Sequence, residues 1–230
     1  MSETRNVAVA IGIANADKLR YLGAAVNGAK AFYAWARELG YEAKLLTDED
    51  APVSMQLLRE TLEQLLKSSG AAKPIHRCIL YFAGHGLIRE ADEGLWLLSD
   101  WYSQLRAVAI EVLRRRLYLY NIAQIAIFSD ACRSLPADMQ ASDLVADGVL
   151  GRGPYPASSL VAIDKFIAAQ DGNLTYSIPG QNSEDDRCIF TGVLLEGLWG
   201  LAPAAFSKLL NKKVTSSSLV LQLQIANCLG

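Results

Sequence analysis

The sequence has few of the residues that build metal centres and disulfide frameworks, with four cysteines and two histidines among 230 residues. The cysteines stand at positions 78, 132, 188 and 228, which gives no C-x-x-C pair and no zinc-finger spacing. No apolar run reaches the ~18 residues of a membrane-spanning helix, and residues 1–6 do not resemble the start of a signal peptide. The sequence therefore predicts a cytoplasmic protein with no membrane segment, no disulfide framework and no metal site.

An excess of one charge is also missing, because 22 Lys and Arg residues nearly balance 24 Asp and Glu residues. The longest basic run is Arg114, Arg115 and Arg116, inside a stretch with helical periodicity. Such a run most often forms the solvated face of a helix, so we expect no nucleic-acid partner. Hydrophobic residues make up 51% of the chain, enough to bury a core of ordinary size.

Short apolar runs alternate with amphipathic stretches along most of the chain. We expect strands at residues 6–13, 41–46, 75–82, 122–128 and 161–169, and helices at residues 22–39, 54–70, 104–120, 190–201 and 215–228. Residues 94–98 fit a short extra strand, while residues 134–159 and 171–187 have the composition of long loops. Strands separated by helices form parallel βαβ units. The pattern predicts an α/β fold in one domain, residues 1–230, with a mostly parallel sheet covered by helices on both faces.

Two reactive side chains follow directly on successive core strands. His85 comes after the third predicted strand and Cys132 after the fourth. Ligands of open α/β sheets bind at the carboxyl ends of the strands, so we expect these side chains to share a cleft. A thiol attacks as its thiolate, and an adjacent imidazole can take the proton. The pattern predicts Cys132 as a nucleophile and His85 as its base, with the backbone N–H of Gly86 available to an oxyanion.

Several segments around this pair resemble known motifs. Residues 81–86 (Y-F-A-G-H-G) resemble the histidine motif, and residues 129–134 (S-D-A-C-R-S) the cysteine motif, of the caspase and metacaspase clan of cysteine peptidases. Residues 7–13, 22–29 and 189–195 are similar to the clan's first strand, its first helix opening and its "FT" segment. The resemblance implies a caspase-like three-layer sandwich and a peptidase acting on protein substrates. It further implies that Cys132 attacks the scissile carbonyl, His85 moves protons, and the N–H groups of Gly86 and Cys132 form the oxyanion hole.

The resemblance also bears on which side chain precedes the cleaved bond. Asp130 stands two residues before Cys132, where the metacaspase-like branch carries a pocket carboxylate. A carboxylate in a partly dry pocket favours a basic side chain, so we expect cleavage after Arg, then Lys. The branch usually carries a second acid where this chain has Gly28, and a serine where it has Ala83.

An acidic run offers a replacement for that second acid. Glu184, Asp185 and Asp186 lie in the loop after the fifth predicted strand. The alternative interpretation is an exposed, solvated run. Some metacaspases bind calcium, but a single acidic run without ligand-like spacing does not favour such a site. We therefore expect no cofactor.

Two further expectations concern processing and regulation. Arg152 stands between two glycines in the 134–159 loop, where this clan often carries its processing linker, and is a candidate self-cleavage site; an uncut loop is the alternative. The clan's sixth strand is not evident after residues 215–228. Either the sheet is short or the chain is the catalytic segment of a longer protein. Bacterial relatives often join such segments to other domains, so we expect a regulatory domain or partner protein.

Two other functions fit the same residues. The first is a caspase-like pseudoenzyme that serves as a protein-interaction module. The second is an unrelated α/β enzyme or small-ligand binder in which Cys132 is merely buried; against it, Gly12 stands alone and no phosphate-binding loop follows the first strand. We interpret Cys78, Cys188 and His76 as structural.

Overall fold

The computed structural model describes residues 4–67, 74–89, 93–132, 144–154, 161–169, 177–178 and 186–201. A five-stranded sheet with the order β2-β1-β3-β7-β9 forms the centre of this part of the chain. Its strands are Arg5–Gly12 (β1), Glu42–Thr47 (β2), Ile75–Gly84 (β3), Ile122–Ala131 (β7) and Ala162–Ile167 (β9). All four pairings are parallel, so the predicted parallel sheet is confirmed.

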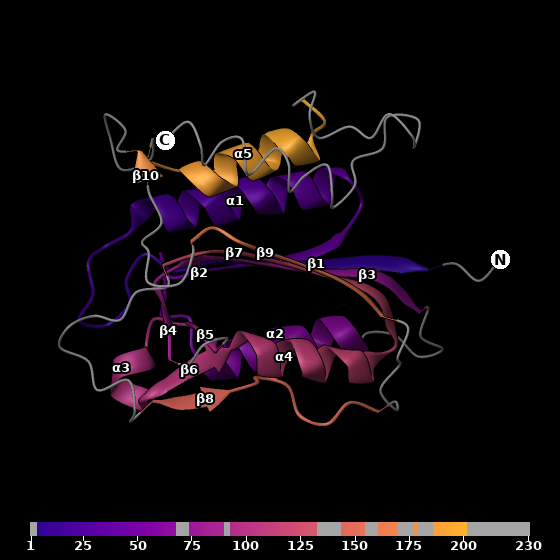
Figure 1. Ribbon diagram of the computed structural model, residues 1–230, viewed down its shortest axis with the longest axis horizontal. Helices are drawn as coiled ribbons and strands as arrows, with labels where there is room; N and C mark the ends of the chain where they lie inside the picture. Colours follow the sequence, from indigo (N-terminus) through magenta and orange to yellow (C-terminus); the bar gives the residue numbers. More distant parts are fainter. Residues whose placement is uncertain are drawn as a thin grey trace.

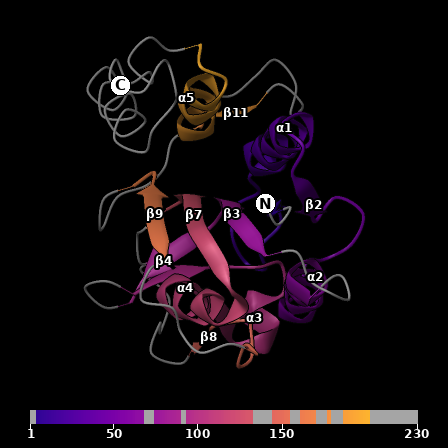
Figure 2. The ribbon, with the colours of Figure 1, turned by 90° about the vertical axis from the view of Figure 1, so that its right-hand side faces the viewer.

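Helices cover both faces of this sheet, as predicted. Helices α1 (Gly23–Glu38) and α5 (Ile189–Leu198) lie on one face, and α2 (Met55–Lys67) and α4 (Ile110–Leu117) on the other (Figure 1). Figure 2, turned by 90°, shows β3, β7 and β9 side by side between these layers. The result is a three-layer α/β sandwich.

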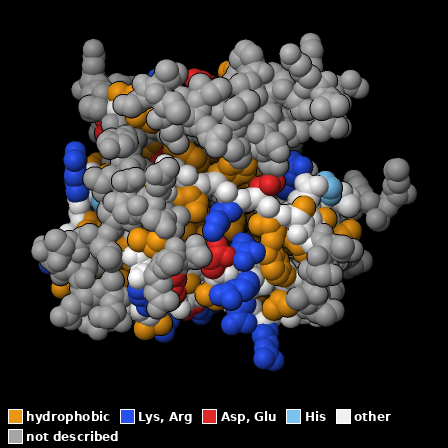
Figure 3. Space-filling view, viewed as in Figure 1, with side chains coloured by type: hydrophobic (Ala, Val, Ile, Leu, Met, Phe, Trp, Pro, Cys, Tyr) orange, Lys and Arg blue, Asp and Glu red, His pale blue; other side chains and the backbone are white. Residues whose placement is uncertain are grey.

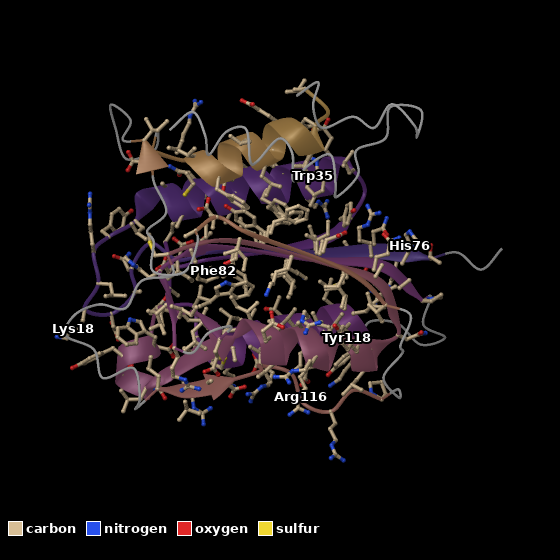
Figure 4. The ribbon with its side chains drawn as sticks, viewed as in Figure 1. Lys18, Trp35, His76, Phe82, Arg116 and Tyr118 are labelled. Atoms are coloured by element: carbon tan, nitrogen blue, oxygen red, sulfur yellow. The ribbon has the colours of Figure 1, made fainter. Side chains whose placement is uncertain are left out.

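Alternate side chains of each strand supply the two cores. On β3, Tyr81 stacks on Phe32 of α1 at 4.6 Å between ring centroids, while Phe82 stacks on Trp96 on the opposite face at 4.7 Å. Figure 4 shows Phe82 on the α2 and α4 side and Trp35 on the α1 side. This alternation decides which layer each residue at a strand end faces.

A second, four-stranded sheet begins immediately after β3. It contains Gly86–Ile88 (β4), Gly94–Trp96 (β5), Arg106–Ala109 (β6) and Val145–Asp147 (β8), in that order. Strand β5 confirms the short extra strand predicted near residues 94–98, and β8 lies within the predicted 134–159 loop. The described residues of the 171–187 loop include two more short strands, Ser177–Ile178 (β10) and Arg187–Cys188 (β11), which pair antiparallel.

The prediction of one helix over residues 104–120 is wrong. The segment contains the end of α3 (Trp101–Gln104), strand β6, helix α4 and a 3-10 turn at Tyr118–Tyr120 (η1). Leu105 has a left-handed backbone with φ of 48°, which breaks the helix. Val108 is fully buried and pairs with Trp96, so sheet pairing overrides the helical periodicity.

The helix predicted at residues 215–228 lies outside the described ranges. Within them, no helix combines the length and the apolar character needed to cross a membrane.

Candidate active site

Strands β3 and β7 end side by side, and their ends carry the two predicted catalytic residues. The parallel ladder between them extends to the pair of Gly84 and Ala131. His85 and Cys132 are the next residues on these neighbouring strands, and both are half-buried. The structure therefore brings the imidazole and the thiol to one edge of the central sheet.

A backbone carbonyl fixes the imidazole of His85. Its Nε2 lies 2.6 Å from the carbonyl oxygen of Arg20, in the loop between β1 and α1. Because a carbonyl only accepts hydrogen bonds, Nε2 carries the proton and Nδ1 of the neutral ring is left as the basic nitrogen. Burial lowers the pKa of His85, and the Arg20 carbonyl partly opposes this shift. The ring is therefore neutral, and able to accept a proton, near neutral pH.

Sequence reasoning did not identify this partner of His85. A main-chain carbonyl leaves no signature in the residue type, and Arg20 lies 65 residues from the histidine it contacts. No pattern in the sequence could have found it.

Gly86 lies close to the end of β7. A Cβ atom at this position would lie 2.8 Å from the carbonyl oxygen of Cys132 and 2.9 Å from Cβ of Ala131. Any larger residue would push the strand ends apart. The backbones of Gly86 and Cys132 thus lie close to one another at the strand ends.

Asp130 lies on the α5 side of the sheet in a buried hydrogen-bonded network. It is 2% exposed. Its Oδ2 accepts hydrogen bonds from Oγ1 of Thr191 at 2.5 Å and from the backbone N of Thr191 at 3.2 Å. Oγ1 of Thr191 also lies 2.5 Å from the Tyr81 hydroxyl. Since the threonine proton goes to Asp130, Tyr81 donates to Thr191.

The second oxygen of Asp130, Oδ1, has fewer hydrogen-bond donors around it. No N–H or O–H donor among the described residues reaches Oδ1. Burial raises the pKa of Asp130 to about 6, against the opposite effects of Thr191 and of the neighbouring Cys188 thiol. Asp130 is therefore a buried carboxyl whose Oδ2 is bound to Thr191 and whose Oδ1 meets no N–H or O–H donor in the described part of the chain.

The Gly28 position faces this same network. A Cβ atom on Gly28 would lie 2.6 Å from the Tyr81 hydroxyl and 3.4 Å from Oγ1 of Thr191. The tyrosine hydroxyl thus occupies the space beside the position where the metacaspase-like branch carries its second acid. Sequence reasoning missed both Tyr81 and Thr191. The available signal was positional, since Tyr81 opens the histidine motif and Thr191 lies in the "FT" segment.

The remaining predicted site residues are those of the acidic run and Arg152. Glu184 and Asp185 lie outside the described residues. Asp186 is described, and its carbonyl accepts a hydrogen bond from Nδ2 of Asn27 at 3.0 Å, which places Asp186 beside α1. Arg152 is exposed, but its neighbour Gly153 packs so tightly that an added Cβ would overlap Leu119.

A narrow, mostly apolar cleft reaches Cys132 from the α4 side. Leu87, Trp96 and Ile167 contribute to its walls, and Glu111 and Lys165, joined by a 2.5 Å ion pair, also line it.

Basic side chains gather over α4 (Figure 3). Arg114 pairs with Glu111 at 2.7 Å, Arg115 is exposed, and Arg116 points away from the sheet (Figure 4).

In the described ranges, no three His, Cys, Asp or Glu side chains are grouped as metal ligands would be.

Sequence comparisons extend over most of the chain. A family model described as the caspase domain matches residues 5–214. A curated protein of a Desulfuromonadales bacterium, described as a probable protease, is 23% identical over 158 residues. That match covers 66% of this chain and 18% of the relative, so the chain spans less than a fifth of the relative's length.

Solved structures share the fold at low identity. A Geobacter sulfurreducens protein superimposes with a TM-score of 0.58 and 18% identity, over 95% of this chain and 88% of that one. Caspase-1 of Spodoptera frugiperda superimposes with a TM-score of 0.56 and 11% identity, over 97% of this chain and 76% of the caspase.

Proposed function

The chain belongs to the caspase domain family of peptidases, and on that premise we propose that it is a cysteine endopeptidase that cleaves proteins after Arg or Lys. The observation that carries the proposal is the position of His85 and Cys132, side by side at the ends of paired strands. The Arg20 carbonyl at Nε2 of His85 supports it, because it leaves the other ring nitrogen basic.

In the proposed reaction, Nδ1 of His85 takes the proton of the Cys132 thiol, and Sγ attacks the scissile carbonyl carbon. The N–H groups of Gly86 and Cys132 bind the developing oxyanion. As the tetrahedral intermediate collapses, His85 gives its proton to the leaving amine, and a thioester remains on Cys132. Water then loses a proton to His85 and attacks the thioester, which releases the carboxylic acid and restores the thiol. The Arg20 carbonyl stabilises the imidazolium formed in each half-reaction.

Asp130 supports the choice of a basic side chain. A buried carboxylate with an unpaired oxygen carries a large desolvation cost, which a cation can offset. Oδ2 is held by Thr191, so the proposed contact with the substrate side chain is at Oδ1, which is buried and which no N–H or O–H donor of the described residues reaches. A guanidinium or ammonium group supplies both the charge and the hydrogen bond that this oxygen lacks.

A panel of fluorogenic peptides that differ only in the residue before the cleaved bond tests the proposal. We expect cleavage after Arg and Lys by the wild type and none by Cys132→Ala. Asp130→Asn should lower kcat/KM for the basic peptides by about 10- to 100-fold, as loss of a hydrogen bond to a charged group would. Asp50→Asn, at an exposed position, is the matched control.

Two results would contradict the proposal in different ways. Faster cleavage after Asp or Leu than after Arg would overturn the specificity while leaving a peptidase. If no peptide were cleaved and a thiol-directed peptidyl inhibitor did not label Cys132, the chain would be a caspase-like interaction module instead.

We further propose that the enzyme uses no cofactor and that a regulatory region or partner protein controls it. The curated relative is much longer than the matched segment, which leaves room in such a protein for a region of this kind.

Arg152 stays the candidate for self-processing. Its side chain is exposed, but Leu150 is 4% exposed, so cleavage needs local opening of this segment. Intact masses of the wild type and Cys132→Ala should differ by a cut after Arg152, and identical masses would exclude processing under those conditions.

A further inference from the structure

The loop between β1 and α1 carries the Arg20 carbonyl that fixes His85. A main-chain oxygen can hold an imidazole only if its loop is itself held in place. This loop contains Lys18, whose backbone is left-handed with φ of 62°, a conformation that a non-glycine residue rarely adopts unaided. The contacts that hold the loop therefore decide where the Arg20 carbonyl lies.

Asp48 makes the most direct of these contacts. It follows β2, whose last pair with β1 is Thr47 with Gly12, so it lies where β1 enters the loop. Its Oδ1 accepts the backbone N–H of Ala14 at 2.9 Å, and its Oδ2 accepts that of Asn15 at 2.6 Å. The side chain is buried, with the residue 8% exposed. Charge-assisted hydrogen bonds of this kind are among the strongest that a loop can receive.

Other hydrogen bonds hold the same loop in addition to those accepted by Asp48. The N–H of Leu22 donates to the carbonyl of Ala14 at 2.9 Å, which ties the two ends of the loop together. The backbone N–H of Asp17 donates to the carbonyl of Ser99 at 3.1 Å. Nε1 of Trp101 donates to the carbonyl of Asp17 at 2.8 Å.

Residues 97–99 contact both Asp48 and the backbone of His85. The Ser99 hydroxyl lies 3.4 Å from Oδ2 of Asp48. Two residues earlier, the N–H of Leu97 donates to the carbonyl of His85 at 3.0 Å. The loop and the histidine backbone are therefore held against one common segment.

We propose that Asp48 is a positioning residue for catalysis, because its carboxylate fixes the 14–22 loop so that the Arg20 carbonyl holds Nε2 of His85. Asp48 itself touches no reacting atom. The kinetic part of the inference rests on the proposed peptidase function, whereas the state of the imidazole can be measured without any substrate.

Asp48→Asn is the decisive variant, because it preserves size and removes one acceptor. Both carboxylate oxygens accept backbone N–H groups, so the amide NH2 of asparagine must face one of these donors. We expect the loop to shift and the hydrogen bond at Nε2 of His85 to weaken. The kcat for a basic peptide should fall about 10- to 100-fold with little change in KM, as for a misplaced base.

The chain's two histidines make the imidazole itself observable. Long-range ¹H–¹⁵N spectra of histidine-labelled protein distinguish the two neutral tautomers. In the wild type we expect His85 in the Nε2–H form, and in Asp48→Asn a shift of its nitrogen signals toward a mixture of both forms. His76 is exposed at the start of β3 and should not change. Asp50→Asn should leave both histidines and kcat as in the wild type.

A second variant keeps the test open if Asp48→Asn does not fold. Trp101→Phe removes the indole N–H that holds Asp17 at the other side of the loop, and we expect the same change at His85 with smaller amplitude. Wild-type nitrogen signals of His85 in every folded variant would overturn the proposal. A loss of activity in the variants that is no larger than their loss of folded protein would also overturn the proposal. If the wild type cleaves no peptide, the proposed function fails, but the tautomer still reports on Asp48.

Discussion

Burial acts in opposite directions on the two titrating residues of the site. It raises the pKa of Asp130 to about 6 and lowers the pKa of His85. A carboxyl is charged above its pKa and an imidazole is neutral above its pKa. Near neutral pH both groups are therefore in the form that the proposed reaction needs, the carboxylate for a basic side chain and the imidazole for the thiol proton.

We expect kcat/KM for an Arg peptide to fall steeply as the pH drops below about 6, the value toward which Asp130 is raised. Protonation of Asp130 removes the attraction for the basic side chain, and protonation of His85 removes the base. A plot of log kcat/KM against pH should approach a slope of two in the wild type. In Asp130→Asn it should approach one, since only His85 still titrates. An unchanged slope in this variant would show that Asp130 takes no part in binding.

At the scale of elements, the surroundings of Asp130 join three parts of the fold. Tyr81 comes from β3, Thr191 from α5 and Gly28 from α1, and they meet around Asp130 at the end of β7. The Tyr81 ring cannot easily move, because it is fully buried and stacked on Phe32. The spacing between α1 and β3 is therefore set at Gly28.

Gly28→Ala tests this spacing. In an ordinary helix interior, alanine in place of glycine stabilises by about 0.5–1 kcal/mol. At Gly28 the new methyl would lie 2.6 Å from the Tyr81 hydroxyl, so we expect a loss of about 1–3 kcal/mol from overpacking. Urea unfolding measures the change.

Tyr81→Phe in the Gly28→Ala background should recover much of that loss, because it removes the oxygen that the methyl meets. Gly192→Ala in α5 is the control, since a Cβ there would meet nothing within 4 Å. Additive effects of the Gly28 and Tyr81 substitutions would contradict the predicted contact.

For the whole molecule, the buried charge of Asp130 is a cost to stability. The carboxyl pKa rises from 3.8 to about 6 on folding, so between these values the folded state binds a proton that the unfolded state has lost. Stability from this group is therefore greatest below about pH 4 and falls as the pH rises to about 6.

Asp130→Asn removes this cost. We expect the melting temperature of the variant, relative to the wild type, to rise between pH 4 and pH 6 and to stay higher above that. The gain at pH 7 should be at most about 3 kcal/mol, from 1.36 kcal/mol per pKa unit. A variant that is less stable than the wild type at pH 7 would show that the network needs the charge.

The sequence predicted most strands of the sheet and the placement of His85 and Cys132, because both depend on local patterns. A buried strand is a short apolar run, and a residue after a parallel strand must lie at the carboxyl edge of the sheet. Strand β6 was missed because its pairing with β5 is not encoded in its own periodicity. The contacts of Arg20, Asp48, Tyr81 and Thr191 were missed because each joins distant parts of the chain, 61 residues apart for Thr191 and Asp130.

The spread of these contacts along the chain also bears on timing. Translation releases the chain from its amino end, and Arg20 emerges long before His85, whose imidazole contacts the Arg20 carbonyl. Thr191, which holds Asp130, follows it by 61 residues. A nascent chain that has already exposed Cys132 therefore still lacks Thr191, the hydrogen-bond partner of Asp130. The hydrogen-bonded network around Asp130 is therefore complete only after α5 has docked.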